Sequence, residues 1–263
     1  MDRQGTDMRR SAGAGRTDLH GRCVVITRPV GCAGALVRSV RAGGGVPIVL
    51  PGLALRAAPD ADVARAALLA ALGDDCVLFT SPAAVHFAVR LAPLRTHANI
   101  LAVGQGTARA LVRHGLREVL LPARQDSEGV LGLPALAEVR DRRVALVGAA
   151  GGRGLLQAEL AGRGALVRQV HVYRRVPARL DRRHFDVLSR LPRSACVLLS
   201  SAEALHNLRG QLPAPALARW LTATAVVSSE RLAAVAREAG FARVRVAASA
   251  LPADLLAGVQ GLA

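Results

Sequence analysis

The sequence contains no lysine, so each of the 35 basic side chains among its 263 residues is an arginine. Such a chain has neither the phosphate-binding lysine of a P-loop nor a lysine that could form a Schiff base. Only 19 residues are acidic, which leaves a formal net charge of +16. Because arginine binds carboxylates and phosphates through paired hydrogen bonds, this imbalance favours an anionic ligand.

Aromatic side chains are also scarce, with four Phe, one Trp and one Tyr. Aliphatic residues must therefore build the interior, and a hydrophobic content of 51% supplies enough of them for packed cores. The isoelectric point of about 11.6 could suggest a nucleic-acid-binding protein. Binding of single strands needs several aromatics on one surface, however, and no basic cluster lies in a recognisable binding motif. We therefore expect no nucleic-acid partner.

The four cysteines form no CxxC pair, and no histidine stands at metal-ligand spacing from Cys23, Cys32, Cys76 or Cys196. We expect reduced thiols, no disulfide and no metal site in a cytoplasmic protein. Residues 1–22 hold five arginines against three aspartates and lack the apolar stretch of a signal peptide, which predicts a flexible basic tail. No apolar run approaches the roughly 18–20 residues that span a bilayer, so no membrane association is expected.

Short β-rich runs alternate with alanine-rich helical stretches, a pattern typical of α/β layering with parallel sheets. Strands are predicted at 23–28, 46–50, 75–80, 99–103, 117–121, 142–147, 166–173, 194–200, 223–227 and 243–247. Helices are predicted at 32–42, 60–72, 82–91, 105–114, 127–138, 151–163, 181–190, 202–211, 229–239 and 252–261.

An internal repeat relates two parts of the chain at an offset of 120 residues. The segment from Cys23 to Leu50 aligns with that from Arg143 to Val170, and LFTSPAAVHFA from Leu78 aligns with LLSSAEALHNL from Leu198. A third pair, AVGQGTARALVRHGL and AVVSSERLAAVAREAGF, follows at a slightly longer offset. Three segments in the same order predict two similar lobes.

An extended run follows the first βα unit of each half, at 46–56 and 167–177. Prolines at 47, 51 and 177 disfavour helix and sit poorly in central strands. We interpret these runs as two connectors between the lobes, forming a hinge of paired strands.

Ligands of open α/β sheets bind beyond the carboxyl ends of the strands, near helix N-termini. The predicted loops there are small and polar, and they offer hydroxyls and backbone N–H groups to anions. Helix capping would also explain them: Ser81 precedes a proline, and Ser200 to Glu203 reads as a capping box. The candidate ligand-binding residues are Arg28, Thr80, Ser81, Gly104, Thr107, Gly148, Arg153, Ser200, Ser201, Ser228 and Ser229.

Familiar catalytic motifs are missing. The GQGTAR and GAAGGRG loops do not read GxGxxG, and no acidic residue follows at the ribose-binding distance, so a dinucleotide is not expected. No Ser/His/Asp order, HExxH or paired carboxylates stand out. His86 and His206 occupy repeat-related helix positions and are interpreted as structural.

Tyr173 is the single tyrosine and lies in the second connector. It is either a catalytic hydroxyl facing a cleft, without a buried partner, or a half-buried interface aromatic with a solvated hydroxyl.

Taken in order, VVITRP, LFTSPAAV, AVGQGTARAL, the GGRGLL to VYRR stretch, the paired serines and VVSSERLAAVAREAGF resemble uroporphyrinogen-III synthases over residues 22–260. The resemblance implies an α/β fold: two similar, doubly wound parallel-sheet lobes joined by a two-stranded β-ladder, with the active site in the cleft between them. Lobe 1 would combine 23–52 with 175–263, and lobe 2 would be 57–166.

The implied reaction cyclises hydroxymethylbilane, a linear tetrapyrrole, to uroporphyrinogen III with inversion of the last ring, without metal or organic cofactor. Tyr173 would assist departure of the hydroxyl, while Ser81, Thr107, Ser200 and Ser229 match positions that contact substrate carboxylates. We expect a monomer that receives this polyanionic substrate from hydroxymethylbilane synthase. A two-lobed anion-binding module without catalysis is the rival interpretation, and the missing export signal disfavours it.

Overall fold

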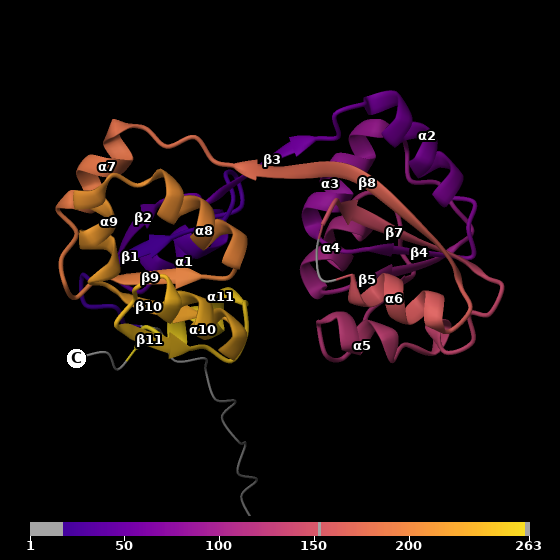
Figure 1. Cartoon of the computed structure of the whole chain (residues 1–263). Helices are drawn as coiled ribbons and strands as arrows, with labels where there is room; N and C mark the ends of the chain where they lie inside the picture. Colours follow the sequence, from indigo (N-terminus) through magenta and orange to yellow (C-terminus); the bar gives the residue numbers. More distant parts are fainter. Residues whose placement is uncertain (1–17, 152–153, 261–263) are drawn as a thin grey trace, which may run out of the picture. The chain divides into compact units, whose positions relative to one another are not determined.

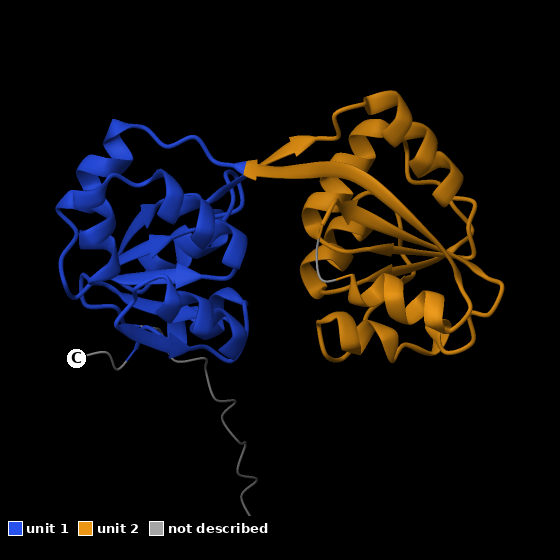
Figure 2. Cartoon of the chain, in the orientation of Figure 1, with its two compact units in different colours: residues 1–54, 177–263 blue, residues 55–176 orange. Residues whose placement is uncertain are grey.

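The computed structural model describes residues 18–151 and 154–260, and the chain divides into two compact units. Unit 1 contains the chain up to Ala54 and from Pro177 onward, and unit 2 is Leu55–Val176 (Figure 2). The chain crosses from one unit to the other within two strands, β3 (Leu53–Ala57) and β8 (Leu166–Pro177), which are neighbours in one sheet. This is the ladder of two strands that the sequence predicted.

Unit 1 is built on a parallel sheet whose strand order, within the described residues, is β11-β10-β9-β1-β2 (Figure 1). Its strands are β1 (Cys23–Ile26), β2 (Val46–Val49), β9 (Cys196–Leu199), β10 (Thr224–Val227) and β11 (Arg243–Val246). Its helices are α1 (Gly34–Ala42), α7 (Arg182–Ser189), α8 (Ala202–Gln211), α9 (Ala214–Leu221), α10 (Glu230–Glu238) and α11 (Pro252–Ala257).

Unit 2 has the strand order β3-β8-β7-β4-β5-β6 among the described residues, and the pairs from β8 to β6 are parallel. Its remaining strands are β4 (Cys76–Phe79), β5 (Asn99–Ala102), β6 (Val119–Leu120) and β7 (Arg143–Ala149). Its helices are α2 (Ala61–Ala71), α3 (Pro82–Leu91), α4 (Gln105–Arg113), α5 (Ser127–Leu131), the 3-10 turn η1 (Pro134–Leu136) and α6 (Leu155–Gly162).

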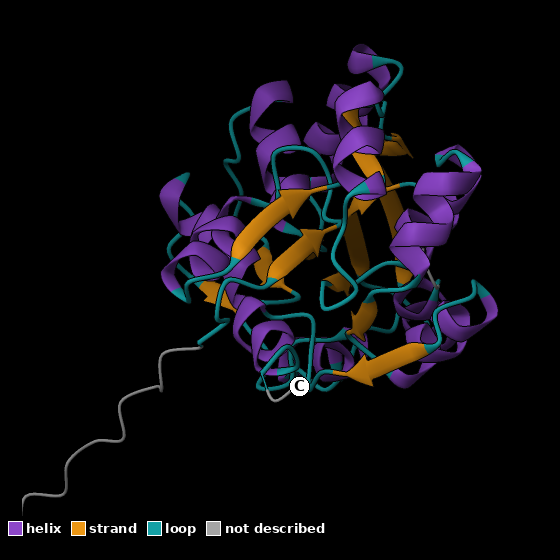
Figure 3. Ribbon diagram, turned by 90° about the vertical axis from the view of Figure 1, so that its left-hand side faces the viewer, coloured by secondary structure: helices purple, strands orange, loops and turns teal. Residues whose placement is uncertain are grey.

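Helices surround the strands (Figure 3). Every central strand sends alternate residues into opposite core layers, so helices pack on both faces of each sheet. In β4, Val77 and Phe79 pack toward α2, α3 and α4, while Cys76 and Leu78 pack toward α5 and α6. In β9, Val197 and Leu199 enter one layer and Cys196 and Leu198 the other. Strands buried on both faces read as continuous apolar runs, which is why the sequence showed them without polar alternation.

The 120-residue repeat is present in the sheets themselves. Cys76 pairs with Val144 in unit 2, and the residues 120 positions away, Cys196 and Val24, pair in unit 1. Substituting β8, β7, β4, β5 and β6 for β2, β1, β9, β10 and β11 converts one strand order into the other.

Turns repeat as well: Gly31 and Gly151, 120 positions apart, both have left-handed backbone with φ near 80° (80° and 78°). Glycine adopts that conformation without the steric cost that a Cβ would add.

Several elements differ from the sequence-based expectation. The helix expected at 127–138 is two short pieces, α5 and η1, and strand β3 was expected only as part of a connector. Residues 46–49, predicted both as a strand and as the start of a connector, form edge strand β2 of unit 1. Pro47 is tolerated there because β2 pairs only with β1 among the described residues. Leu19, which was predicted to lie in the flexible tail, is 2% exposed and belongs to a core cluster of unit 1. Its N–H donates to the Gly43 carbonyl at 2.7 Å. Helix α9 was missed because Pro213 and Pro215 flank its start, although proline fits the first turn of a helix.

Candidate functional site

The polar loops predicted as ligand-binding lie at the carboxyl edges of the two sheets, as parallel strands require. In unit 1, Arg28 follows β1, while serine pairs follow β9 and β10. In unit 2, Thr80 and Ser81 follow β4, and Gly104 and Thr107 lie at the start of α4. Gly148 is the second-last residue of β7. Arg153 lies outside the described residues.

Three of the serines cap helices. The hydroxyl oxygens of Ser81, Ser201 and Ser229 accept hydrogen bonds from backbone N–H groups three residues later, at 3.1, 3.2 and 3.3 Å. The predicted capping box from Ser200 to Glu203 does not form, because the N-cap is Ser201 and Glu203 is therefore one residue early. Each capping hydroxyl still has its own proton, so capping and anion binding are compatible.

Close backbone approaches explain two of the glycines. A Cβ on Gly148 would collide with Oγ1 of Thr80, and one on Gly104 would lie 2.9 Å from Oε1 of Gln125. That Gln125 oxygen accepts the Gln105 N–H at 2.8 Å, so it occupies the N-terminus of α4. Sequence analysis did not single out Gln125, because no local pattern links it to a helix 20 residues earlier. Thr107 is 2% exposed and offers almost no surface to a ligand.

Tyr173 projects from β8 at a β-bulge. Gly148 pairs with His171 and Ala149 with Tyr173, so Val172 is an extra residue in the ladder. The bulge breaks the usual alternation and sends Val172 and Tyr173 into the same core layer, beside α3.

The hydroxyl of Tyr173 does have a protein partner, contrary to the expectation from sequence. Its oxygen lies 3.2 Å from Oγ of Ser81, and the residue is only 8% exposed. The ring stacks on Phe87, with centroids 5.3 Å apart and planes 14° from parallel. Phe87 was also missed, because a phenylalanine at helical spacing carries no signal beyond core packing. His86 is exposed and touches the edge of Phe87.

Arg28 is half-buried, and its guanidinium donates to the carbonyl of Ala250 in the loop after β11. Its buried Nε has no hydrogen-bond partner among the described residues. Burial lowers the pKa of Arg28, and the neighbouring Cys32 thiol partly offsets this effect. A guanidinium remains charged at neutral pH, so Arg28 presents a partly desolvated cation with one unmet donor. Such a group suits a carboxylate ligand.

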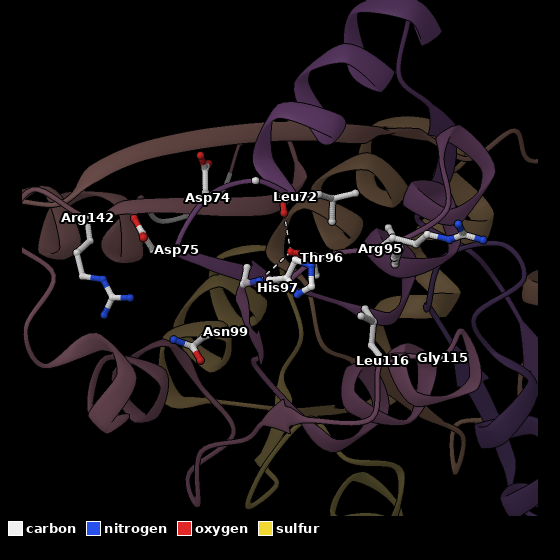
Figure 4. Close-up of a pocket in the computed structure, with 13 residues that line it drawn as sticks. Leu72, Asp74, Asp75, Arg95, Thr96, His97, Asn99, Gly115, Leu116 and Arg142 are labelled. Atoms are coloured by element: carbon white, nitrogen blue, oxygen red, sulfur yellow. Dashed lines mark hydrogen bonds between the residues drawn. The ribbon is translucent and has the colours of Figure 1, made fainter.

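A hollow of about 810 Å³ opens at the opposite, amino edge of the unit 2 sheet (Figure 4). Asp75, Asn99 and Arg142 line it, all close to the starts of β4, β5 and β7. Thr96 supports its wall, donating to the Leu72 carbonyl at 2.5 Å. The hollow is therefore remote from Tyr173 and the polar loops of the same unit.

Within residues 18–151 and 154–260, no group of three or more His, Cys, Asp or Glu side chains is arranged to hold a metal ion. All four cysteines are free thiols. None of the helices in these ranges has the length and hydropathy required to cross a membrane.

Two linked α/β units, each built on a mainly parallel sheet with hydroxyl-bearing loops at its carboxyl edge, define the structural class of this protein. A family model described as uroporphyrinogen-III synthase HemD matches residues 34–257. The chain belongs to this family.

Curated relatives agree with this assignment. The uroporphyrinogen-III synthase of Escherichia coli K12 is 30% identical over 249 residues, covering 90% of this chain and 99% of the relative. That of Salmonella typhimurium LT2 is 29% identical over 252 residues, with coverage of 90% and 99%.

Solved structures show the same fold. A mutant uroporphyrinogen III synthase from the extremely thermophilic bacterium Thermus thermophilus aligns with a TM-score of 0.57 and 22% identity, over 92% of this chain and 98% of that one. The uroporphyrinogen-III synthetase of Helicobacter pylori 26695 aligns with a TM-score of 0.60 and 15% identity, over 92% and 100% of the two chains.

Proposed function

We propose that this protein is a cofactor-free lyase that cyclises hydroxymethylbilane to uroporphyrinogen III, inverting the last ring. The match of the family model to residues 34–257 carries the proposal. That range contains Tyr173 and every candidate loop except the one that holds Arg28. The reaction belongs to tetrapyrrole biosynthesis.

The reaction begins with loss of the substrate's hydroxyl group. The hydroxyl takes up a proton and leaves as water, while electrons from the attached pyrrole form an azafulvene. The substituted carbon of the last ring attacks this electrophile and gives a spiro intermediate. Fragmentation and reclosure in the inverted sense follow, and a proton leaves the ring carbon, so that the net change is loss of one water.

Conformational control is the main task of the enzyme in this proposal. Uncatalysed closure gives the uninverted isomer, so the protein must hold the substrate in the conformation that leads to the spiro intermediate. The step from an electron-rich pyrrole needs no strong acid, which is consistent with a site that lacks a paired-carboxylate or histidine motif. Tyr173 is the proposed proton donor to the departing hydroxyl.

Substrate recognition is proposed to rest on the carboxylates, because every ring bears an acetate and a propionate. Arg28 supplies a charge with an unmet N–H donor. The capping hydroxyls of Ser201 and Ser229 and the backbone N–H groups at helix N-termini supply neutral donors in a positive field. Of the remaining candidates from the sequence, Thr80, Gly104, Ser200 and Ser228 lie in the same loops, and Gly148 lies near the end of β7. Arg153, outside the described residues, stays a candidate from the sequence.

The finer expectations about partners are part of the same proposal. Four free thiols support action in the reducing cytoplasm. Because free substrate closes spontaneously to the wrong isomer, direct handover from hydroxymethylbilane synthase would protect it. Each unit has its own sheet with cores on both faces, which supports a monomer.

The test is to supply hydroxymethylbilane to the purified protein and to separate the product isomers by chromatography. We expect mainly uroporphyrinogen III, against mainly the uninverted isomer in a control without protein. Binding of the substrate without any change in isomer ratio would favour the anion-binding module instead.

A further inference from the structure

We propose that Ser81 and Phe87 of helix α3 are positioning residues for Tyr173: Ser81 directs the phenolic proton and stabilises the phenolate, while Phe87 fixes the ring. The inference rests on the proposed role of Tyr173 as proton donor. Both residues act through Tyr173 and neither needs to touch the reacting atoms. Helix α3 and β8 are neighbours in unit 2 (Figure 1).

The argument for Ser81 starts from its hydrogen-bond capacity. A serine hydroxyl has one proton and two lone pairs. One lone pair of Ser81 accepts the Ala84 N–H at 3.1 Å. The proton of Ser81 can therefore be donated to the Tyr173 oxygen, which lies 3.2 Å away. In that arrangement the phenolic proton of Tyr173 is not used within the protein and is available to the departing hydroxyl.

Transfer of that proton strengthens the arrangement. Once Tyr173 is a phenolate it can only accept, so Ser81 must donate, and a hydrogen bond to an ionised oxygen is roughly twice as strong as a neutral one. The N-terminus of α3 adds a positive field at the same place, because Ser81 is its N-cap. Both effects stabilise the phenolate that remains after proton transfer, so the geometry around Tyr173 favours release of its proton.

The argument for Phe87 concerns the ring. Tyr173 stands at a bulge, where the ladder constrains its direction less than regular pairing would. The stacked Phe87 ring, 5.3 Å away and 14° from parallel, limits rotation of the phenol about its long axis. Ser81 and Phe87 lie on the same helix, so α3 sets both the plane of the ring and the partner of its hydroxyl.

The test keeps all charged and titratable groups on the neighbouring elements, so a difference between variants reports the substituted residue. Those near Tyr173 along these elements are His86 and Arg90 on α3, His171, Arg174 and Arg175 on β8, and Arg56 on β3.

We would compare the wild type with Ser81→Ala, Ser81→Thr, Phe87→Leu and Asp181→Ala, with circular dichroism to confirm that each variant folds. Asp181→Ala is the matched control, since it removes the side-chain cap of α7 in unit 1 and should leave kcat unchanged.

Turnover then separates positioning from mere folding. Ser81→Ala should lower kcat about tenfold with little change in KM, with recovery in Ser81→Thr. Phe87→Leu should lower kcat by a similar factor, with the isomer ratio retained.

An undiminished kcat in Ser81→Ala would overturn the inference, as would a lowered kcat that Ser81→Thr does not recover. Absence of uroporphyrinogen III from the wild-type reaction would instead overturn the proposed function.

Discussion

The two units are copies of one fold that differ at both edges of their sheets. At the amino edge of unit 2, the fully buried carboxylate of Asp74 pairs with Nε of Arg168 at 3.0 Å and with Nε of Arg143 at 3.8 Å. The positions 120 residues away in unit 1 are Ser194, Ile48 and Cys23. Strands β4 and β7 in unit 2 therefore pair in the same register as β9 and β1 in unit 1, although only unit 2 has the buried ion pairs. The ion pairs are therefore not what specifies the fold.

The carboxyl edges differ in their chemistry. In unit 2, β8 runs on to Pro177 and carries Tyr173, whereas its counterpart β2 in unit 1 ends at Val49. In unit 1, the turn after β1 carries Arg28, where unit 2 has Gly148. In the proposed function, the carboxyl edge of unit 2 therefore supplies the proton donor, and that of unit 1 supplies a half-buried cation.

Replacing Tyr173 should give the largest effect, and it tests the difference between the carboxyl edges of the two units. Tyr173→Phe keeps the ring and its stacking on Phe87 but removes the proton, so we expect the rate to fall by about 10²–10⁴-fold. The product should remain mostly the inverted isomer, because conformation and not proton transfer selects it. Loss of the bond to Ser81 should lower the free energy of unfolding by about 1 kcal/mol.

Initial rate and isomer ratio are to be measured on the same samples. An undiminished rate would make Tyr173 structural. A slow enzyme producing mainly the uninverted isomer would mean that the hydroxyl shapes the bound substrate.

Removing the carboxylate of Asp74 tests the difference between the amino edges of the two units. Asp74→Ala leaves two arginines without their buried partner and should cost about 3 kcal/mol in the free energy of unfolding, at the low end of the range because the arginines are half exposed. Ser194→Ala, the matched change in unit 1, should cost less than about 0.5 kcal/mol. Urea titration measures both.

A triple substitution tests whether the unit 1 residues can replace the ion pairs of unit 2. The triple variant Asp74→Ser, Arg143→Cys, Arg168→Ile gives unit 2 the residues of unit 1 and should recover most of the stability. If it is as unstable as Asp74→Ala, the two edges are not interchangeable.

Arg28→Ala should have a smaller effect, confined to binding. Removing the partly desolvated cation should raise KM about tenfold and lower kcat less, which is the expected scale of one charge-assisted contact. Wild-type KM should rise with salt, since ionic screening weakens exposed carboxylate contacts. Arg113→Ala, in the last turn of α4, is the control and should leave KM unchanged. A wild-type KM independent of salt would remove the electrostatic argument.

The smallest expected effect concerns a feature that the units share. Burial raises the pKa of Cys76 in unit 2 and of Cys196 in unit 1, which occupy equivalent strand positions. The folded protein then binds these protons more tightly than the unfolded chain does. The contribution of these two thiols to the free energy of unfolding should therefore be constant below the ordinary thiol pKa of about 8.5. It should fall as the pH rises above that value. The test is to measure the urea midpoint of the wild type and of the double variant Cys76→Ala/Cys196→Ala as the pH is raised through this range. If the midpoint falls equally steeply with pH in both proteins, the thiols do not cause the fall.

Much of the architecture followed from local patterns. Continuous apolar runs between helical stretches predicted the parallel strands, and the matched pairs around Cys23 and Arg143 predicted two similar units. These signals survive in the sequence because each strand must be buried on both faces and each turn needs its glycine, whatever lies elsewhere in the chain. Tyr173 stood out for a comparable reason, as the single tyrosine in an extended run. The family resemblance added the reaction.

Tertiary structure alone decided how the site is assembled. Nothing near Tyr173 in sequence indicates the extra residue Val172, the bond to Ser81 92 positions earlier, or the stacking on Phe87. The tether of Arg28 to Ala250 spans 222 positions, and Gln125 reaches back 20 residues to cap α4. Local patterns record what each segment must bury. Which hydroxyl meets which ring depends on strand order and a one-residue bulge, and these exist only once the sheet has formed.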